Sequence, residues 1–220
     1  MDLSDITYLA FGDSITYGAD HANNYAKMPH PYPELVGETL GLCCVKNLGI
    51  SGATLVRGRV GRACMTDRIL SCELSGDLIS VLLGVNDYAD SSPLGAPEDK
   101  EPDTVYGALD TALRHLTEKY PRAKIFIMTP YETSIKGVSG TEKNSLGYTL
   151  PDVCRAVKTV AARYSVPVLD LYNEGGYREE IALPTSDGIH PSPDFVREHT
   201  APQVAAFIKE LFSESKDVNV

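Results

Sequence analysis

Five short hydrophobic runs recur along the chain and predict its strands. They span residues 5–11, 43–48, 77–83, 124–129 and 166–171. Each run is nearly continuous in apolar or β-branched residues, which is typical of strands whose two faces are both buried. The pattern therefore predicts five strands of a sheet that is covered by other elements on both sides.

Helical periodicity fills the stretches between these runs. It predicts a helix over 103–119 and a second one that opens at Thr149 and Asp152, which have the spacing of a capping box. A last helix is predicted to begin at the Ser-Pro pair 192–193, because serine caps helices well and proline suits the first position. Pro202 lies inside this last helix and predicts a kink or a break.

The order of these elements indicates the fold class. Strands that alternate with helices imply parallel strands joined by right-handed crossovers. We therefore predict a three-layer α/β/α fold with a flavodoxin-like central parallel sheet of five strands. A chain of 220 residues suits a single domain, 1–220, and its polar tail after about residue 213 is expected to fray.

Three loops that follow predicted strands are longer than a minimal connection. They cover residues 17–31, 87–102 and 130–148, and the first contains His21 and Tyr25. Loops that follow parallel strands emerge at the carboxyl edge of the sheet, where ligands bind in such folds. We expect these three loops to form the walls of a substrate site.

Composition narrows the classes of function. A formal net charge of -10 argues against a nucleic-acid partner. The N-terminus, MDLSDITYLAFGDS, has no cationic segment and no long apolar run, so it predicts no signal peptide, and no stretch reaches the length of a membrane span. Five cysteines without C-x-x-C spacing indicate neither a disulfide framework nor a zinc site. We expect a cytoplasmic protein, and the sequence leaves its oligomeric state open.

Two polar runs at strand ends carry candidate chemistry. GDSIT, residues 12–16, follows the first predicted strand, and DGIH, residues 187–190, follows the last. Asp187 and His190 are about one turn apart, so the carboxylate can bond one ring nitrogen and leave the other free. Ser14 adds a hydroxyl on a tight strand-to-helix turn. A hydroxyl nucleophile needs such a base, oriented by a third group, so these residues predict an acyl-transfer site.

Two further runs, NLGISG at 47–52 and GVND at 84–87, follow the second and third predicted strands. Each of the four runs taken alone is an ordinary turn or helix cap. Together, in this order and spacing, they resemble the four blocks of the SGNH (GDSL-type) hydrolase family of esterases and lipases, and the resemblance covers nearly the whole chain. Ile15 stands where the first block usually has leucine.

The resemblance implies a role for each block. Ser14 would be the nucleophile, and its backbone N–H would be one oxyanion donor. Gly52 would offer a second backbone N–H and Asn86 a side-chain amide. His190 would act as general base and then as general acid, and Asp187 would hold the imidazole. Such chemistry needs preorganised donors around a developing alkoxide and implies no cofactor and no metal.

We therefore predict a serine esterase that acts on a small-molecule ester, for example an acylated carbohydrate, through an acyl-serine intermediate. The carboxyl-edge loops are mostly polar, which favours a short acyl chain such as acetyl. Tyr88 and Tyr131 are the candidate substrate-binding residues, and Leu94 and Leu146 are further apolar candidates for the pocket wall. The alternatives are an acyltransferase that moves the acyl group onto an acceptor hydroxyl such as that of a sugar, a lysophospholipase-type acyl hydrolase, and a non-catalytic flavodoxin-like binding protein.

Other polar residues receive structural interpretations. Asp13, next to the candidate nucleophile, is expected to accept hydrogen bonds from loop amides. Arg57 and Arg59 follow the glycine-containing run and are expected to be a solvated pair.

Overall fold

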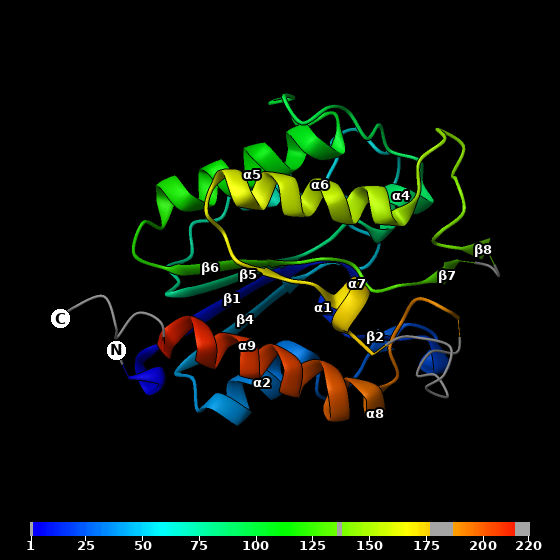
Figure 1. Cartoon of the computed structure of the whole chain (residues 1–220). Coiled ribbons are helices and arrows are strands. Elements are labelled where there is room, and N and C mark those ends of the chain that lie inside the picture. Colours follow the sequence, from blue (N-terminus) through cyan, green and yellow to red (C-terminus); the bar gives the residue numbers. More distant parts are fainter. Residues whose placement is uncertain (1, 136–137, 177–186, 214–220) are drawn as a thin grey trace.

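The five apolar runs form one parallel sheet (Figure 1). The computed structural model describes residues 2–135, 138–176 and 187–213, and in it the strands lie in the order β4-β1-β5-β6-β9. Their bounds are β4 (Cys44–Gly49), β1 (Thr7–Gly12), β5 (Leu78–Leu82), β6 (Lys124–Met128) and β9 (Val168–Leu169). This order confirms the predicted flavodoxin-like sheet. The expected fraying after about residue 213 falls outside the described residues.

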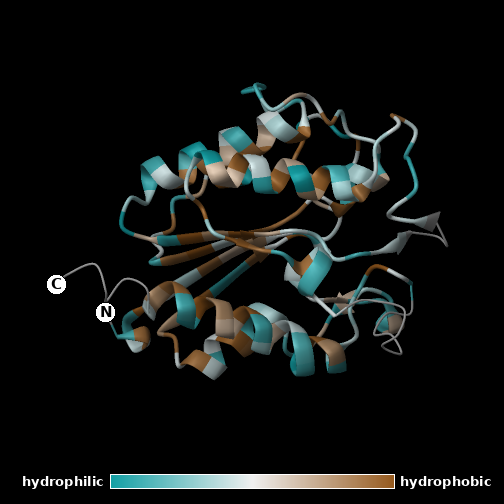
Figure 2. Cartoon of the chain, viewed as in Figure 1, coloured by the Kyte–Doolittle hydropathy of each residue, from teal (hydrophilic) through white to brown (hydrophobic). Residues whose placement is uncertain are grey.

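Alternate side chains of each strand enter two different hydrophobic cores. In β1, Leu9 and Phe11 face one core, whereas Tyr8 and Ala10 face the other. Helices cover both cores, and their apolar sides face the sheet (Figure 2). One layer contains α3 (Met65–Leu70), α4 (Val85–Ala89), α5 (Val105–Lys119) and α6 (Leu150–Arg163), and the other contains α2 (Tyr32–Leu40), α8 (Pro193–Phe195) and α9 (Ala201–Ser213). The three-layer prediction is therefore confirmed.

The observed helices begin close to the residues that the sequence predicts. Helix α5 begins at Val105, and the Thr104 side chain that precedes it accepts a hydrogen bond from the Gly107 N–H at 3.1 Å. Helix α6 opens with the predicted capping box, in which the Thr149 N–H donates to the Asp152 carboxylate at 2.8 Å. These caps satisfy backbone groups that the first turn of a helix leaves without a partner.

The last helix is interrupted, as Pro202 predicts. Ser192 caps α8 and accepts from the Phe195 N–H at 3.2 Å. A π-helical segment, η3 (Val196–Thr200), follows α8, and α9 begins directly after it with Pro202 as its second residue. Proline cannot donate a backbone hydrogen bond, so the chain changes its helical pitch in the turn that precedes it.

The long loops gather at the carboxyl edge of the sheet, on the right of Figure 1. The first contains the short hairpin β2 (Ala19–Asp20) and β3 (Ala26–Lys27), with a 3₁₀ turn, η2 (His21–Asn23), between them. The third contains a second hairpin, β7 (Ser134–Ile135) and β8 (Val138–Ser139). The remaining short elements are η1 (Leu3–Asp5), α1 (Ser14–Tyr17) and α7 (Leu171–Glu174). Across the described ranges, none of the helices has the length and apolar character that crossing a membrane requires.

Candidate active site

Ser14, His190 and Asp187 are hydrogen-bonded in series at the carboxyl edge. The His190 Nε2 atom lies 2.8 Å from the Ser14 hydroxyl oxygen, and its Nδ1 atom lies 2.7 Å from the Asp187 carboxylate. Only 10% of the His190 side chain and 14% of the Asp187 side chain are exposed. The series therefore has the order and the contact distances that a hydroxyl nucleophile, a base and an orienting group require.

The DGIH turn holds its own carboxylate in place. The Asp187 Oδ1 atom accepts from the backbone N–H of Ile189 at 3.0 Å and of His190 at 2.9 Å. Burial disfavours the ionised carboxylate, but the hydrogen bonds from His190 and Ile189 outweigh it and hold the pKa of Asp187 below its ordinary value. Gly188 has a φ of +79°, and a Cβ there would lie 2.1 Å from the Ser134 carbonyl oxygen. The turn thus requires glycine both for its backbone conformation and for the close approach of the third loop.

Ser14 occupies the first position of α1, directly after β1. Its neighbour Asp13 caps the helix, because the Asp13 Oδ1 atom accepts from the Ile15 N–H at 2.9 Å, which confirms the structural interpretation of Asp13. Gly12 precedes them, and a Cβ on it would lie 2.0 Å from the Thr16 hydroxyl oxygen. The tight turn that presents the Ser14 hydroxyl therefore depends on the absence of a side chain at Gly12.

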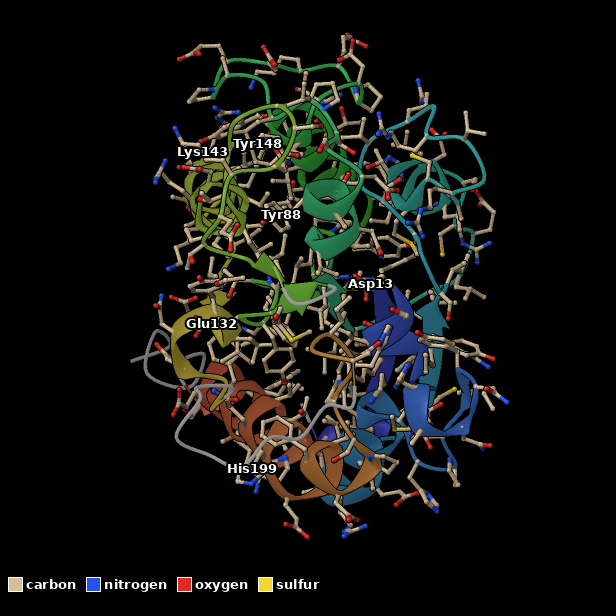
Figure 3. The ribbon with its side chains drawn as sticks, turned by 90° about the vertical axis from the view of Figure 1, so that its right-hand side faces the viewer. Asp13, Tyr88, Glu132, Lys143, Tyr148 and His199 are labelled. Carbon is tan, nitrogen blue, oxygen red and sulfur yellow. The ribbon has the colours of Figure 1, made fainter. Side chains whose placement is uncertain are left out.

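Asp13 lies at the end of β1 in the view onto the carboxyl edge (Figure 3). Only 1% of it is exposed. This burial, opposed by the hydrogen bond from Ile15 and reinforced by the charge of Asp87, raises the pKa of Asp13 to about 7. A carboxyl group that changes its charge near neutral pH is thus adjacent in sequence to the candidate nucleophile.

Gly52 and Asn86, the two other candidate oxyanion donors, come from adjacent segments. Asn86 lies on α4, and its side-chain amide donates to the Ala53 carbonyl oxygen at 3.0 Å, which places it next to the Gly52 turn. Gly52 has a φ of +75°, and a Cβ there would lie only 2.6 Å from the Nη1 atom of Arg62. A carboxamide has two N–H donors, and the bond to Ala53 uses one of them.

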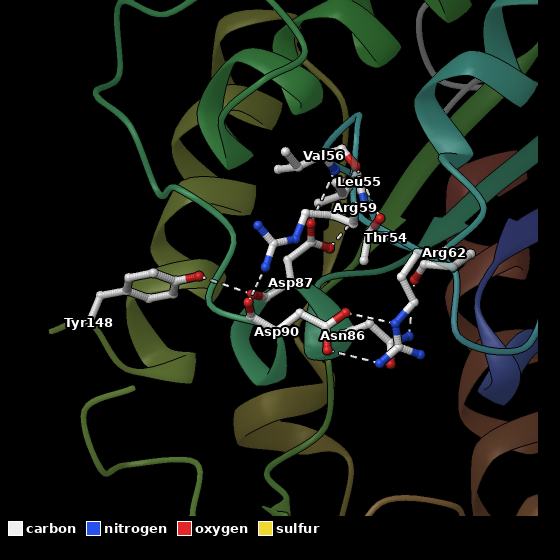
Figure 4. Close-up of polar contacts among 10 residues, drawn as sticks. Thr54, Leu55, Val56, Arg59, Arg62, Asn86, Asp87, Asp90 and Tyr148 are labelled. Atoms are coloured by element: carbon white, nitrogen blue, oxygen red, sulfur yellow. Dashed lines mark hydrogen bonds and ion pairs between the residues drawn. The ribbon is translucent and has the colours of Figure 1, made fainter. Parts of the chain in front are cut away.

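A buried carboxylate ties the segment after Gly52 to α4 (Figure 4). Asp87, next to Asn86, accepts from the backbone N–H groups of Leu55 at 2.9 Å and Val56 at 3.0 Å. Burial raises the pKa of the Asp87 carboxyl to about 6, although these two hydrogen bonds favour its ionised form. The same contacts fix the distance between the Gly52 turn and the helix that carries Asn86.

A second link between these segments lies at the surface. Arg62 binds Asp90 in a bidentate manner, with its Nε atom 2.7 Å and its Nη2 atom 2.8 Å from the two carboxylate oxygens (Figure 4). Arg59 donates to the backbone carbonyl of Asp90. Arg57 is exposed, as expected of a solvated arginine, and forms a surface ion pair with Asp67. The expectation needs correction for Arg59, which is half-buried and binds the carbonyl of Asp90, the residue that follows α4.

The structure gives both candidate substrate-binding tyrosines packing roles. Tyr131 is fully buried, and its hydroxyl donates to the Thr200 hydroxyl at 2.8 Å, so the side chain offers no surface to a ligand. Tyr88 is 4% exposed, and its hydroxyl donates to the Glu142 carbonyl oxygen at 2.8 Å. Tyr88 thereby anchors the third loop to α4. Figure 3 shows it beside Tyr148 at the carboxyl edge of the sheet. Leu94 packs against the core, whereas Leu146 is 57% exposed.

An aromatic contact that the sequence analysis did not predict lies beside His190. The ring of Tyr25, from the connection between β2 and β3, packs edge-on against the His190 ring with 5.3 Å between centroids. The His21 ring packs against the same tyrosine, with 5.1 Å between centroids. The sequence places Tyr25 in a carboxyl-edge loop, but it contains no signal that pairs this ring with a histidine far along the chain.

Metal ligands do not cluster in the described part of the chain. Its residues include no group of three or more His, Cys, Asp or Glu side chains that could hold a metal ion. The five cysteines are all unpaired.

Comparison with known proteins agrees with the fold. One solved structure is 32% identical, with a TM-score of 0.87 over 96% of this chain and 99% of its own. A carbohydrate acetylesterase family member from Sinorhizobium meliloti is 18% identical, with a TM-score of 0.64 over 94% and 99% of the two chains. The aryl esterase of M. smegmatis is 20% identical, with a TM-score of 0.68 over the same shares. No curated protein matches the sequence.

A parallel α/β sheet that carries a hydrogen-bonded serine, histidine and aspartate at its carboxyl edge is an arrangement typical of hydrolytic enzymes. The model of the GDSL-like lipase/acylhydrolase family matches residues 10–197, which include all four polar blocks. The chain belongs to this family and is a carboxylic ester hydrolase, so its substrate is a small-molecule ester.

Proposed function

We propose that the protein hydrolyses esters of short acyl chains through a covalent acyl-Ser14 intermediate. The observation that carries the proposal is the continuous hydrogen-bond series from Asp187 through His190 to Ser14. In the first step, the Ser14 oxygen attacks the ester carbonyl while its proton passes to the His190 Nε2 atom. The C–O bond to the alcohol then breaks, and His190 returns the proton to the departing oxygen.

Water completes the cycle by the same route. His190 removes a proton from a water molecule, the resulting hydroxide adds to the acyl carbon, and the bond to Ser14 breaks as the serine regains its proton. Asp187 holds the Nδ1–H of the imidazole at 2.7 Å, which leaves Nε2 as the basic atom facing Ser14. The carboxylate also stabilises the imidazolium that forms in each half of the reaction.

Three donors stabilise the developing oxyanion in this proposal, namely the Ser14 N–H, the Gly52 N–H and the Asn86 amide. Two local contacts support this role. The Asn86 side chain is oriented by its bond to the Ala53 carbonyl, and the Asp87 carboxylate fixes the segment that follows Gly52. Such donors stabilise the transition state because they are oriented before charge develops.

The preference for a short acyl chain is supported by the polar lining of a surface cavity that shares Arg62 with the surroundings of Gly52. A surface cavity of about 430 Å³ is lined by Gly58, Arg59, Val60, Arg62 and Asp90. One of these residues is apolar, and the Arg62 guanidinium also borders Gly52 itself. A long acyl chain needs a continuous apolar trough, and guanidinium and carboxylate groups would have to lose water to receive it. Burial of Tyr131 and Tyr88 removes further apolar surface from the edge.

A Ser14→Ala variant and an ester series test the proposal together. A fluorophosphonate probe should label the GDSIT peptide of the wild-type chain, and the variant should show neither labelling nor hydrolysis. A nitrophenyl ester series should give its highest kcat/KM at two to four acyl carbons, with each unfavourable lengthening step costing roughly 1 kcal/mol. A maximum at twelve carbons would overturn the short-chain part and favour the lysophospholipase-type alternative.

Acyl transfer onto an acceptor alcohol uses the same acyl-enzyme and is the second candidate. Product analysis with and without a sugar acceptor distinguishes the two, because a transferase forms the new ester at the expense of free acid. The cytoplasmic location and the domain bounds of 1–220 stay predictions.

A further inference from the structure

Tyr25 is a half-exposed aromatic side chain in direct contact with the base of the proposed mechanism. It is 50% exposed, whereas the His190 side chain against which it packs is only 10% exposed. The two rings meet edge to face at an angle of 74°, and His21 meets Tyr25 at 70°. One part of the tyrosine ring therefore touches His190, and another part is open to solvent at the carboxyl edge.

The backbone that carries Tyr25 is unusual. Asn24 and Tyr25 are consecutive residues other than glycine with φ values of +51° and +59°. Asparagine tolerates this left-handed conformation, but an aromatic residue rarely adopts it. Strain of this kind persists only where the surrounding structure imposes it, and it concentrates at functional sites.

Hydrogen bonds around the hairpin impose the conformation. The Tyr25 N–H donates to the Asp20 carbonyl oxygen at 2.8 Å, and the Met28 N–H donates to the Gly18 carbonyl oxygen, also at 2.8 Å. Strands β2 and β3 pair between these two bonds. The hairpin is thus tied at its base and at its tip, and it directs the Tyr25 ring toward His190.

The chemistry of the proposed reaction decides which part of the substrate meets this ring. His190 must protonate the oxygen of the departing alcohol, so that oxygen has to lie next to the Nε2 atom. The carbonyl oxygen occupies the other side of Ser14, toward Gly52 and Asn86. The alcohol therefore leaves the site along the His190 side, where Tyr25 offers its exposed surface.

We propose that Tyr25, supported by His21, forms the subsite for the alcohol part of the ester and selects alcohols that carry a ring. A half-exposed aromatic side chain can stack with a ring, either an aryl ring or the C–H face of a pyranose, and contributes little to the binding of a short alkyl alcohol. This inference rests on the proposed acyl-Ser14 mechanism and adds to it the class of alcohol.

The test compares three acetate esters that share one acyl group and differ in their alcohol. They are phenyl acetate, a 6-O-acetylated methyl glucopyranoside and ethyl acetate. Tyr25→Asn removes the ring while keeping a residue that accepts a positive φ, so the hairpin should stay folded. Tyr25→Phe keeps the ring and removes only the hydroxyl. Tyr17→Leu is the matched control, because Tyr17 lies near the same hairpin, where Lys27 stacks on its ring at 5.9 Å.

In Tyr25→Asn, kcat/KM for at least one ring-bearing ester should fall about 10-fold, while the value for ethyl acetate should change less than about 2-fold. The ester that loses rate tells whether the ring is aryl or glycosyl. Tyr25→Phe and Tyr17→Leu should keep the wild-type ratios. Because each ester is compared between the variant and the wild type, differences in leaving-group reactivity between the esters cancel.

Equal losses for all three esters would overturn the inference, since they would mean that Tyr25 only supports the His190 ring. Unchanged rates for all three would overturn it as well. If Tyr25→Asn fails to fold, competition decides, because phenol or methyl glucoside should inhibit the wild-type enzyme more strongly than ethanol does, and equal inhibition would reject the subsite. Failure of the mechanism itself has a different signature, which is hydrolysis that survives in Ser14→Ala.

Discussion

Replacing Asp13 with asparagine should stabilise the folded protein at neutral and alkaline pH and have little effect in acid. Asp13 is 1% exposed, and its Oδ1 atom accepts the capping bond from the Ile15 N–H. An asparagine oxygen can accept the same bond, because asparagine is also a favourable capping residue. The substitution therefore removes a buried carboxylate and leaves the cap of α1 in place.

The size of the effect follows from the change in pKa. Burial is the main reason that the pKa of Asp13 rises from 3.8 to about 7 in the folded protein. Between these values the folded chain keeps a proton that the unfolded chain has released. The contribution of Asp13 to stability is therefore complete below about pH 4 and is lost as the pH rises through 7. The change in pKa corresponds to a loss of about 4 kcal/mol at most.

Urea unfolding of both proteins between pH 4 and pH 8.5, on the order of ten pH values, measures this difference. The free energy of unfolding of Asp13→Asn minus that of the wild type should be near zero at the acid end and should grow to a few kcal/mol at the alkaline end. Asp20→Asn is the matched control, because Asp20 caps a similar but partly exposed turn by accepting from the Ala22 N–H at 3.1 Å. A difference for Asp13→Asn that does not vary with pH would refute the reasoning.

Three further substitutions address the site directly. Asn86→Ala should lower kcat roughly 10²–10³-fold with little change in KM, and an unaltered kcat in steady-state assays would remove Asn86 from the oxyanion site. Gly52→Ala should lose more activity and thermal stability than the control Gly58→Ala. Both glycines have positive φ values, but only the Cβ at Gly52 would meet Arg62. Equal losses in the two variants would count against this packing argument. Asp187→Asn should reduce kcat by roughly 10⁴-fold with an unchanged circular dichroism spectrum, because the imidazole loses its orienting acceptor, and near-normal turnover would contradict that role.

Much of the site was predictable because it depends on local sequence and on sheet topology. The runs around Ser14 and His190 follow apolar strands, and parallel strands bring their carboxyl ends to one edge. The cap at Asp13 and the capping box at Thr149 need only short-range geometry, and both appear in the structure. Features that arise from neighbours in the sequence or from the order of strands could therefore be predicted from the sequence.

Features that depend on long-range packing could not be predicted from the sequence. Tyr131 lies in a carboxyl-edge loop, as the sequence indicates, but its burial depends on Thr200 and Phe195, which belong to the distant C-terminal helical region. The contact between Tyr25 and His190 likewise depends on how a hairpin folds back over the sheet edge. No pattern within either segment specifies which way its side chain turns.

The hydrogen bond between Ser14 and His190 joins residues 176 positions apart in the chain. Ser14 follows β1, a strand between β4 and β5, while His190 lies beyond the last strand of the sheet. A ribosome releases the serine long before the histidine, so a partly made chain contains a nucleophile without its base. Closing so long a loop also requires the intervening sheet to form first. Esterase activity would therefore appear only after His190 has been made and has reached Ser14, and recovery of turnover after dilution from denaturant would report that long-range contact.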